Sequence, residues 1–185
     1  MKVTETTLPG VLVFEPKVWG DARGFFFETW HRDRYSEYGL PSNWAQDNLS
    51  RSALGVLRGL HFQKPNSQGK LVSVLQGAVY DVAVDVRVGS PTFGRSFGVE
   101  LSGENHKQLW VPAGFAHGFC VVTESALFTY KCTDLYTPAA EATIAWNDPD
   151  LGINWPLESP SLSEKDARGI RLKDMPRERL PTYSH

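Results

Sequence analysis

The sequence has little cysteine and no long hydrophobic run. Its 185 residues include two cysteines, Cys120 and Cys132, and both lie in apolar stretches typical of strands. We expect both to be buried, reduced thiols, because a disulfide or a metal pair has weaker support from the neighbouring residues. No run approaches the roughly 20 apolar residues that a membrane-spanning helix requires, which argues against a membrane protein.

An excess of one charge is also missing. The 19 Lys and Arg residues nearly balance 21 Asp and Glu, and they form no basic block. Nucleic acid is therefore a poor candidate partner, whereas one phosphorylated small molecule needs only a few local cations. The opening stretch MKVTETTLPGVLVFEP lacks the apolar core of a signal peptide. We expect a cytoplasmic protein without a membrane partner.

The length of the chain suits one domain, residues 1–185, with a sizeable core. We find no internal repeat and no linker. Residues 156–185 are rich in Pro, Ser and charge, which is typical of a less regular, solvated and loosely packed tail.

Strand signals dominate the middle of the chain. In LVSVLQGAVYDVAVDVRVG, a first strand ends near Leu75, Gln76 and Gly77 turn the chain, and a second strand follows with period-two alternation. Its apolar face is expected to carry Tyr80, Val82, Val84, Val86 and Val88, and its mixed face Val79, Asp81, Ala83, Asp85 and Arg87.

Other short strands are expected where Gly, Pro, Asn or Asp separate apolar segments: SFGVELS, KQLWVPAG, HGFCVVTE, ALFTYKCTDLY and ATIAWND. Many short strands with such punctuation predict an all-β sandwich or barrel. Helix is scarce. Residues 29–39 are expected to form one helix, with Thr29 as its N-cap, and SEKDARG to begin a short second one.

The segment LRGLHFQ places two cationic side chains in a predicted strand. In an unbroken strand, Arg58 and His61 would face opposite sides. A bulge or bend at Gly59 would bring both to one side. The alternative is a hydrogen-bonded core or rim histidine beside an unrelated surface arginine.

The segment VPAGFAHGF has the spacing of Pro112, Gly114 and His117 that resembles the second motif of the cupin superfamily. This resemblance implies a jelly-roll barrel, also called a double-stranded β-helix. A metal site needs three or four converging ligands, and here His61 stands without the His-x-His partner that metal-binding cupins carry. We therefore expect a cupin barrel with no metal, and a structural turn histidine is the alternative for His117.

Two other motifs place polar groups beside aromatic residues. They are RGFFFETW, with Arg23 and Glu28, and AQDNLSRS, with Gln46, Asp47 and Asn48. Such a combination suits a pocket for a planar base, or an ordinary subunit interface. In ALFTYKCTDLY, Tyr130 is expected to point into the barrel, where a buried tyrosine is structural more often than catalytic.

Taken together, these segments resemble the family of dTDP-4-dehydrorhamnose 3,5-epimerases over roughly residues 1–166. The resemblance is carried, in order, by PKVWGDARGFFFETW, QDNLS, GVLRGLHFQ, QGKLV, VYDVAVDVR, SPTFG, LWVPAGFAHGF, YKCTDLY, WNDPDLGINWP and LSEKD. It implies a homodimer that needs no cofactor and epimerises dTDP-4-dehydro-6-deoxy-D-glucose at C3 and C5. Both protons flank the C4 ketone, so such an enzyme must supply a base, an acid on the opposite face and a cation near the oxyanion.

By this resemblance His61 matches the general base, Asp166 its carboxylate partner, Lys70 the ammonium facing the C4 oxygen, and Tyr130 the proton donor. The positions matching those that hold the nucleotide sugar are Arg23, Glu28, Gln46, Asp47, Asn48, Arg58, His117, Glu141 and Lys165. Tyr136 matches the aromatic residue that stacks on thymine. The resemblance leaves open that Arg23 and Glu28 act in the partner subunit's site.

Three alternatives stay open from the sequence. A related epimerase that inverts only C3 or C5 would use the same motifs, and product labelling in deuterated buffer would distinguish it. A non-catalytic cupin would bind the sugar nucleotide, or serve as a structural jelly-roll, without any exchange. A metal-dependent cupin oxygenase would carry stoichiometric iron or zinc.

Overall fold

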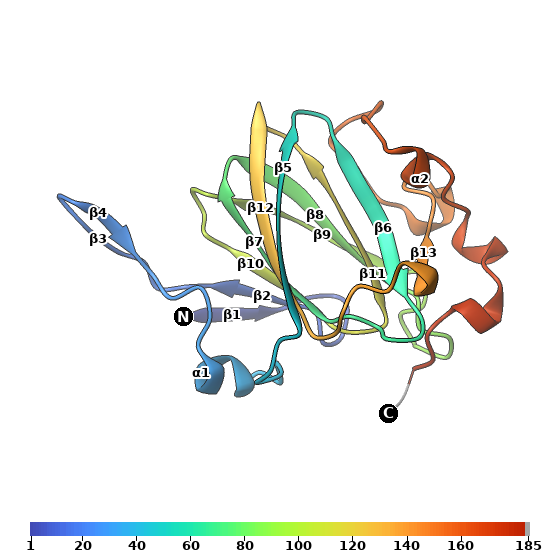
Figure 1. Ribbon diagram of the computed structural model, residues 1–185, viewed down its shortest axis with the longest axis horizontal. Coiled ribbons are helices and arrows are strands. Elements are labelled where there is room, and N and C mark those ends of the chain that lie inside the picture. The colour runs from blue at the N-terminus through green and yellow to red at the C-terminus, as the bar shows by residue number, and fades with distance from the viewer. Residues whose placement is uncertain (184–185) are drawn as a thin grey trace.

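The computed structural model describes residues 1–183, and two antiparallel sheets form its body (Figure 1). The six-stranded sheet has the order β1 (Lys2–Glu5), β2 (Leu12–Glu15), β10 (Gln108–Val111), β7 (Lys70–Gln76), β12 (Ser125–Cys132) and β5 (Gln46–Ala53). The five-stranded sheet has the order β13 (Glu141–Thr143), β6 (Leu57–Gln63), β11 (Phe115–Val121), β8 (Ala78–Asp85) and β9 (Ser96–Ser102). The predicted all-β jelly-roll of the cupin type is confirmed.

A third, small sheet lies apart from these two. It is the hairpin of β3 (Trp19–Asp21) and β4 (Gly24–Phe26), which extends away from the body of the molecule (Figure 1). The aromatic side chains of Trp19, Phe25 and Phe26 on this hairpin are exposed.

The main core fills the space between the two sheets. It is built from alternate residues of each strand, such as Val72 and Val74 on β7, Val79 and Ala83 on β8, and Phe119 on β11. Burying a side chain of this kind stabilises the fold by about 1.5–3 kcal/mol. The period-two pattern of the sequence therefore sets which residues face inward.

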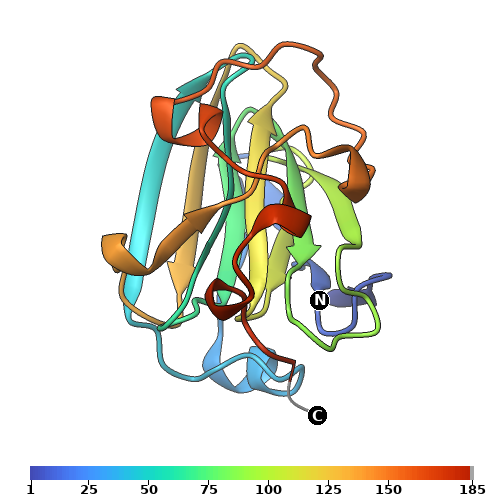
Figure 2. The same cartoon turned by 90° about the vertical axis from the view of Figure 1, so that its right-hand side faces the viewer.

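A second apolar layer covers the outside of the five-stranded sheet. Val82 and Val84, on the outer face of β8, belong to a buried cluster with Leu172, Met175 and Leu180 from the C-terminal segment. Figure 2 shows this segment running across the sheet. The expectation of a solvated, loosely packed tail was therefore wrong, because its scattered apolar residues find partners on the outward valines.

Helix is scarce, as expected, but the first helix is shorter than predicted: it has five residues, whereas residues 29–39 were expected to be helical. It is α1 (Arg32–Ser36), with His31 rather than Thr29 as the N-cap. The Thr29 carbonyl instead accepts a hydrogen bond from Gln108 Nε2 at 2.7 Å, which ties this part of the chain to β10. The other helices are α2 (Glu164–Ala167), η1 (Pro138–Ala140), η2 (Pro149–Leu151), η3 (Leu172–Asp174) and η4 (Arg177–Arg179).

The second strand of the central hairpin ends earlier than its alternation suggests. β8 stops at Asp85, whose buried carboxylate accepts hydrogen bonds from Arg87, Ser90 and Thr92 in the following loop. Burial alone would raise the pKa of Asp85, but these donors lower it overall. Val86 is still buried in the outer layer with Val82 and Val84, so it lies on the face that the alternation predicts.

The bulge expected at Gly59 is present. Between β6 and β11 the register runs from His61 opposite His117 to Arg58 opposite Phe119, so β6 has one residue more than its partner strand. The extra residue cancels the parity difference, and both Arg58 and His61 line the same cavity.

Two further expectations concern the cysteines and membrane-spanning segments. Cys120 and Cys132 are both free and buried, as expected. Within residues 1–183, no helix is long and apolar enough to cross a membrane.

Candidate active site

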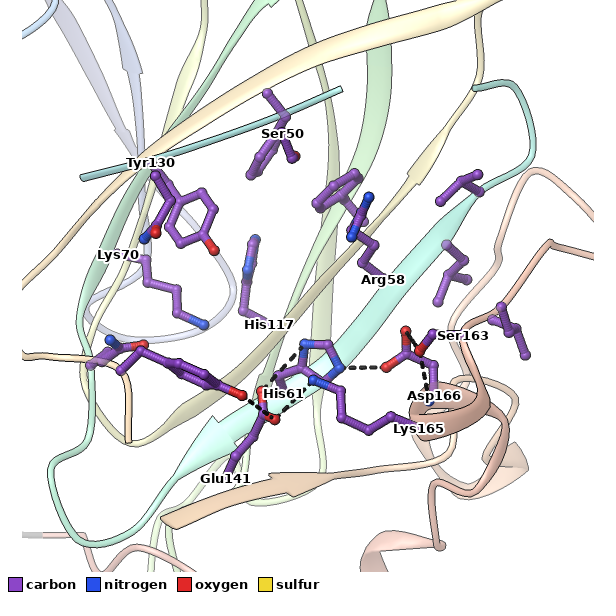
Figure 3. A pocket seen from close by; sticks show the side chains of 18 of the residues that line it. Ser50, Arg58, His61, Lys70, His117, Tyr130, Glu141, Ser163, Lys165 and Asp166 are labelled. Carbon is purple, nitrogen blue, oxygen red and sulfur yellow. Dashed lines mark hydrogen bonds and ion pairs between the residues drawn. The ribbon is translucent and has the colours of Figure 1, made fainter. Parts of the chain in front are cut away.

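A cavity of about 670 Å³ opens between the sheets and the C-terminal segment (Figure 3). Its polar lining continues the same inward-facing rows that form the core. Lys70 follows the parity of Val72 on β7, and Tyr130 follows that of Phe128 on β12. Each row is therefore apolar in the core and polar where it meets the cavity.

His61 and Asp166 form a close pair in this cavity. His61 Nε2 and Asp166 Oδ1 are 2.5 Å apart. The Asp166 side chain is almost fully buried, whereas that of His61 is partly exposed to the cavity. An ionised carboxylate fixes the tautomer with the proton on Nε2 and leaves the Nδ1 lone pair free to accept a proton.

Asp166 is held in place by the N-terminus of α2. The N-cap is Ser163, whose hydroxyl accepts a hydrogen bond from Asp166 N and donates one to Asp166 Oδ2 at 2.8 Å. Burial acts to raise the pKa of Asp166, but the bonds from His61 and Ser163 lower it overall, so the group is a carboxylate at neutral pH.

Lys70 and Tyr130 lie on the side of the cavity away from Asp166 (Figure 3). Burial lowers the pKa of the Lys70 ammonium, while nearby Cys132, Glu141 and Asp81 act in the opposite direction. Burial also raises the pKa of the Tyr130 phenol, which keeps its proton at neutral pH. The cavity thus contains a lysine and a protonated tyrosine facing the histidine.

Two more cationic or potentially cationic groups line the cavity. His117 Nε2 lies 2.9 Å and 3.1 Å from the two carboxylate oxygens of Asp81, which is completely buried. Arg58 Nε donates to Ser52 Oγ at 3.1 Å. Both side chains are fixed from behind, and the Arg58 guanidinium keeps further N–H donors for the cavity, which His117 also lines.

Glu141 joins three cavity residues. Its Oε2 accepts hydrogen bonds from Lys165 Nζ at 2.8 Å and from Tyr136 OH at 3.1 Å. Its Oε1 lies 4.0 Å from His61 Nδ1. Desolvation, followed by the nearby Glu141, raises the pKa of Tyr136, so this phenol remains a donor.

Most of the site residues predicted from the sequence are brought together here. Those that line the cavity are Gln46, Asn48, Arg58, His61, Lys70, His117, Tyr130, Tyr136, Glu141, Lys165 and Asp166.

Three predicted site residues do not line the cavity. Arg23 lies on the β3–β4 hairpin and pairs with Asp21 at 2.5 Å, and Glu28 pairs with Arg34. Asp47 points to the outer face of β5, because it alternates with Gln46 and Asn48, and it pairs with Lys131 there at 2.9 Å. Its place gives no support to a substrate contact within this subunit.

Other cavity residues were not singled out from the sequence. Ser50 continues the inward-facing row of Gln46 and Asn48 on β5, so the alternation of that strand would have found it. Its buried hydroxyl has no hydrogen-bond partner within residues 1–183. Ser163 was detectable as the first residue of a Ser-x-x-Asp capping pattern, whereas Gln68, in a loop, carried no signal.

The arrangement can support proton transfer on both sides of a bound ring. A histidine oriented by a carboxylate faces a protonated tyrosine, and an enclosed lysine lies beside the tyrosine. Among the described residues, no three His, Cys, Asp or Glu side chains gather as the ligands of a metal ion would.

The known proteins that this chain resembles are nucleotide-sugar epimerases. The sequence model of the family described as dTDP-4-dehydrorhamnose 3,5-epimerase matches residues 5–174. A protein of that name from Pseudomonas aeruginosa is 55% identical over 176 residues, which cover 94% of this chain and 97% of the relative. A dTDP-4-dehydrorhamnose 3-epimerase from Streptomyces niveus is 39% identical and covers 100% of this chain, with 90% of the relative covered.

A solved structure agrees over the whole chain. It is that of a dTDP-6-deoxy-D-glucose-3,5-epimerase from Legionella pneumophila in complex with dTDP-4-keto-L-rhamnose. The two share 52% sequence identity and a TM-score of 0.97, over 100% of this chain and 99% of the other.

Proposed function

The chain belongs to the dTDP-4-dehydrorhamnose 3,5-epimerase family, and from that premise we propose its reaction. It inverts C3 and C5 of dTDP-4-dehydro-6-deoxy-D-glucose and forms dTDP-4-dehydro-L-rhamnose, a step of dTDP-L-rhamnose biosynthesis. The observation that carries this proposal is the His61–Asp166 pair in one cavity with Lys70 and Tyr130.

The first step is removal of a proton next to the C4 ketone. His61 Nδ1 accepts the proton, and the electrons of the C–H bond pass into an enolate whose oxygen carries negative charge. Asp166 stabilises the imidazolium that results. Lys70 places an ammonium near the developing oxyanion, so the substrate's own carbonyl serves as the electron sink and no cofactor is needed.

The second step returns a proton to the other face of the ring. Tyr130 is suited to this because burial keeps it protonated and because it lies across the cavity from the His61–Asp166 pair (Figure 3). Transfer from Tyr130 to the carbanion carbon inverts that centre. The same pair of groups then acts on the second carbon, which the ketone activates equally.

The remaining cavity residues suit a nucleoside diphosphate. Arg58, His117 and Lys165 supply donors for the pyrophosphate, with a bidentate geometry available to the arginine. Gln46 and Asn48 offer amides to polar groups of the ligand. The Tyr136 ring, which is partly exposed at the cavity, offers a stacking surface for thymine.

The β3–β4 hairpin supports a homodimer. Its exposed Trp19, Phe25 and Phe26 form an apolar surface that a partner subunit would cover. Arg23 and Glu28 lie on or next to this hairpin and outside their own cavity, so we place them in the site of the partner. We also propose a cytoplasmic location, consistent with a nucleotide-sugar substrate.

The single-centre epimerase is less well supported. Seven curated relatives named as 3,5-epimerases share 47–55% identity with this chain, whereas a relative named as a 3-epimerase shares 39%. A protein that only binds the nucleotide sugar would not need the His61–Asp166 pair. It would also not need the enclosed Lys70 and Tyr130.

The product of the reaction tests the proposal. The purified protein is mixed with dTDP-4-dehydro-6-deoxy-D-glucose in D₂O, and the sugar is followed by NMR. We expect inversion and deuterium at both C3 and C5. Label at one carbon alone would establish the single-centre alternative, and tight dTDP binding without any label would establish the binding protein.

A further inference from the structure

Glu141 lies where it can take up the proton that His61 collects. Its carboxylate oxygen Oε1 is 4.0 Å from His61 Nδ1, and its other oxygen is bound by Lys165 and Tyr136. The Glu141 side chain is 12% exposed, whereas that of Lys165 is 48% exposed. Glu141 therefore lies between the partly buried His61 and a side chain that reaches solvent.

Inversion of two centres creates a need for such a group. After the first inversion, His61 carries one extra proton and Tyr130 has lost one. Both must return to their starting states before the second carbon can react, while the nucleotide sugar is still held. A single inversion followed by product release does not impose this requirement.

The proton that His61 takes from the substrate can leave only from Nδ1. Nε2 already directs its hydrogen at Asp166, at 2.5 Å, and that carboxylate is buried and further bound by Ser163. The abstracted proton is on Nδ1. Within residues 1–183, Glu141 provides the one carboxylate oxygen within 4.0 Å of this nitrogen.

We propose that Glu141 accepts the proton from His61 Nδ1 after each abstraction and delivers it to solvent, which resets the base between the two inversions. The N–H bond breaks and its electron pair stays on nitrogen, while an O–H bond forms on Oε1. Loss of that proton to water restores the carboxylate, and Tyr130 takes a proton from water to become a phenol again, so one proton leaves and one returns. This inference rests on the proposed function, because only a reaction at two carbons requires the reset.

Substrate binding would prepare Glu141 for this role. An approach of about 1 Å brings Oε1 within hydrogen-bond distance of Nδ1. Lys165 holds the other oxygen in the free protein, and Lys165 is also the cation assigned to the pyrophosphate. Once the ammonium turns to phosphate, the carboxylate loses one of its two donors and can turn towards the imidazole.

Tyr136 stays hydrogen-bonded to Glu141 while the proton is transferred. Its raised pKa keeps it a phenol, so it orients Glu141 and does not accept the proton. The backbone of Glu141 is fixed separately, since Arg179 donates to its carbonyl oxygen at 2.7 Å. The side chain can thus turn while the strand stays in place.

The test is a single-turnover reaction in D₂O with wild type and Glu141→Gln, quenched at successive times and analysed by NMR. We expect the variant to slow the second inversion at least tenfold more than the first, so that sugar inverted and labelled at one carbon accumulates. Formate, a small proton carrier, should restore the second inversion in proportion to its concentration, with no effect on wild type. Glu124→Gln, at an exposed turn, serves as the matched control and should behave as wild type.

Equal slowing of both inversions, with no response to formate, would overturn the proposal and assign Glu141 to substrate positioning alone. If Glu141→Gln does not fold, Glu141→Asp keeps the carboxylate with a shorter reach, and formate should accelerate its second inversion. Absence of that response would equally overturn the proposal. Failure of the proposed function is a separate result, because wild type itself would then not label both carbons.

Discussion

Gly59 on β6 and Gly118 on β11 are in such close contact that a Cβ atom on Gly59 would lie 2.5 Å from Gly118 Cα. Gly59 also has a φ of +129°, which residues with a side chain rarely adopt. This contact lies within the bulge that brings Arg58 and His61 into the same cavity. The geometry of the site thus depends on two residues that carry no side chain.

Gly59→Ala should lower the free energy of unfolding by about 2–5 kcal/mol, the sum of an unfavourable φ and an overlap that rigid backbone cannot relieve. Gly89→Ala is the matched control. Gly89 also has a positive φ, +90°, but an added Cβ would meet nothing within 4 Å. Gly89→Ala should lower the free energy of unfolding by about 1–2 kcal/mol. Denaturant unfolding of both variants measures the difference, and equal losses would show that the close contact is unimportant.

Tyr130→Phe should separate proton removal from inversion. His61 can still remove a proton and return one to the same face, so solvent deuterium should enter the substrate without inversion. Net epimerisation should fall about 10²–10⁴-fold, the usual contribution of a general acid. NMR in D₂O reads both quantities from one sample. A parallel loss of exchange and inversion would argue against Tyr130 as the acid.

Asp166→Asn should lower kcat about 10–100-fold, because the amide no longer fixes the reactive tautomer or stabilises the imidazolium. The affinity for dTDP should be unchanged, since Asp166 bonds to His61 and Ser163. Calorimetry with dTDP separates this effect from a loss of binding.

The same variant has a predicted pH dependence of stability. The pKa of Asp166 is lower in the folded protein than the value of about 3.9 in an unfolded chain. Its contribution to the free energy of unfolding is therefore complete above about pH 4 and is lost as the pH falls through the folded pKa. The stability difference between wild type and variant should close as the pH falls below about pH 4. A difference that persists in acid would contradict the ionised pair.

Lys70→Met should abolish most activity but stabilise the protein. Burial lowers the pKa of Lys70 in the folded state, so the enclosed ammonium costs free energy below that folded pKa. The cost disappears as the pH rises from the folded pKa towards about 10.4, the value of an unfolded lysine. We expect a gain of about 1 kcal/mol or more at pH 6 and a smaller one at pH 10. Lys173→Met, at an exposed position, should show no such pH dependence. A stability loss in Lys70→Met would show that the enclosed Lys70 does not destabilise the fold.

The strands could be read from the sequence because period-two alternation states which side chains share a face, but the alternation did not show which face of β8 points inward. Its mixed face, with Val79 and Ala83, joins the main core, and its apolar face lies under the C-terminal segment. The bulge was predictable too, since Arg58 and His61 could share a cavity only if Gly59 broke the alternation. These are local properties of the chain, and local properties are what a sequence displays.

The packing of the C-terminal segment could not be read in this way. Its apolar residues Leu172, Met175 and Leu180 are isolated in sequence, and they become a layer only against the outer valines of β8. Asp166 shows the same limit. The capping pattern at Ser163 marks the start of a helix, but nothing nearby says that its third residue reaches a histidine 105 positions away. Only the resemblance to the family assigned that role.

His61 is proposed to act as the base for both carbons. The most direct test measures solvent deuterium exchange at C3 and C5 with His61→Ala, after binding of dTDP has been confirmed. We expect exchange to fall at both carbons by about 10²–10⁴-fold while dTDP still binds. Exchange that continues at either carbon at the wild-type rate would contradict this role of His61, because another group would then be removing that proton.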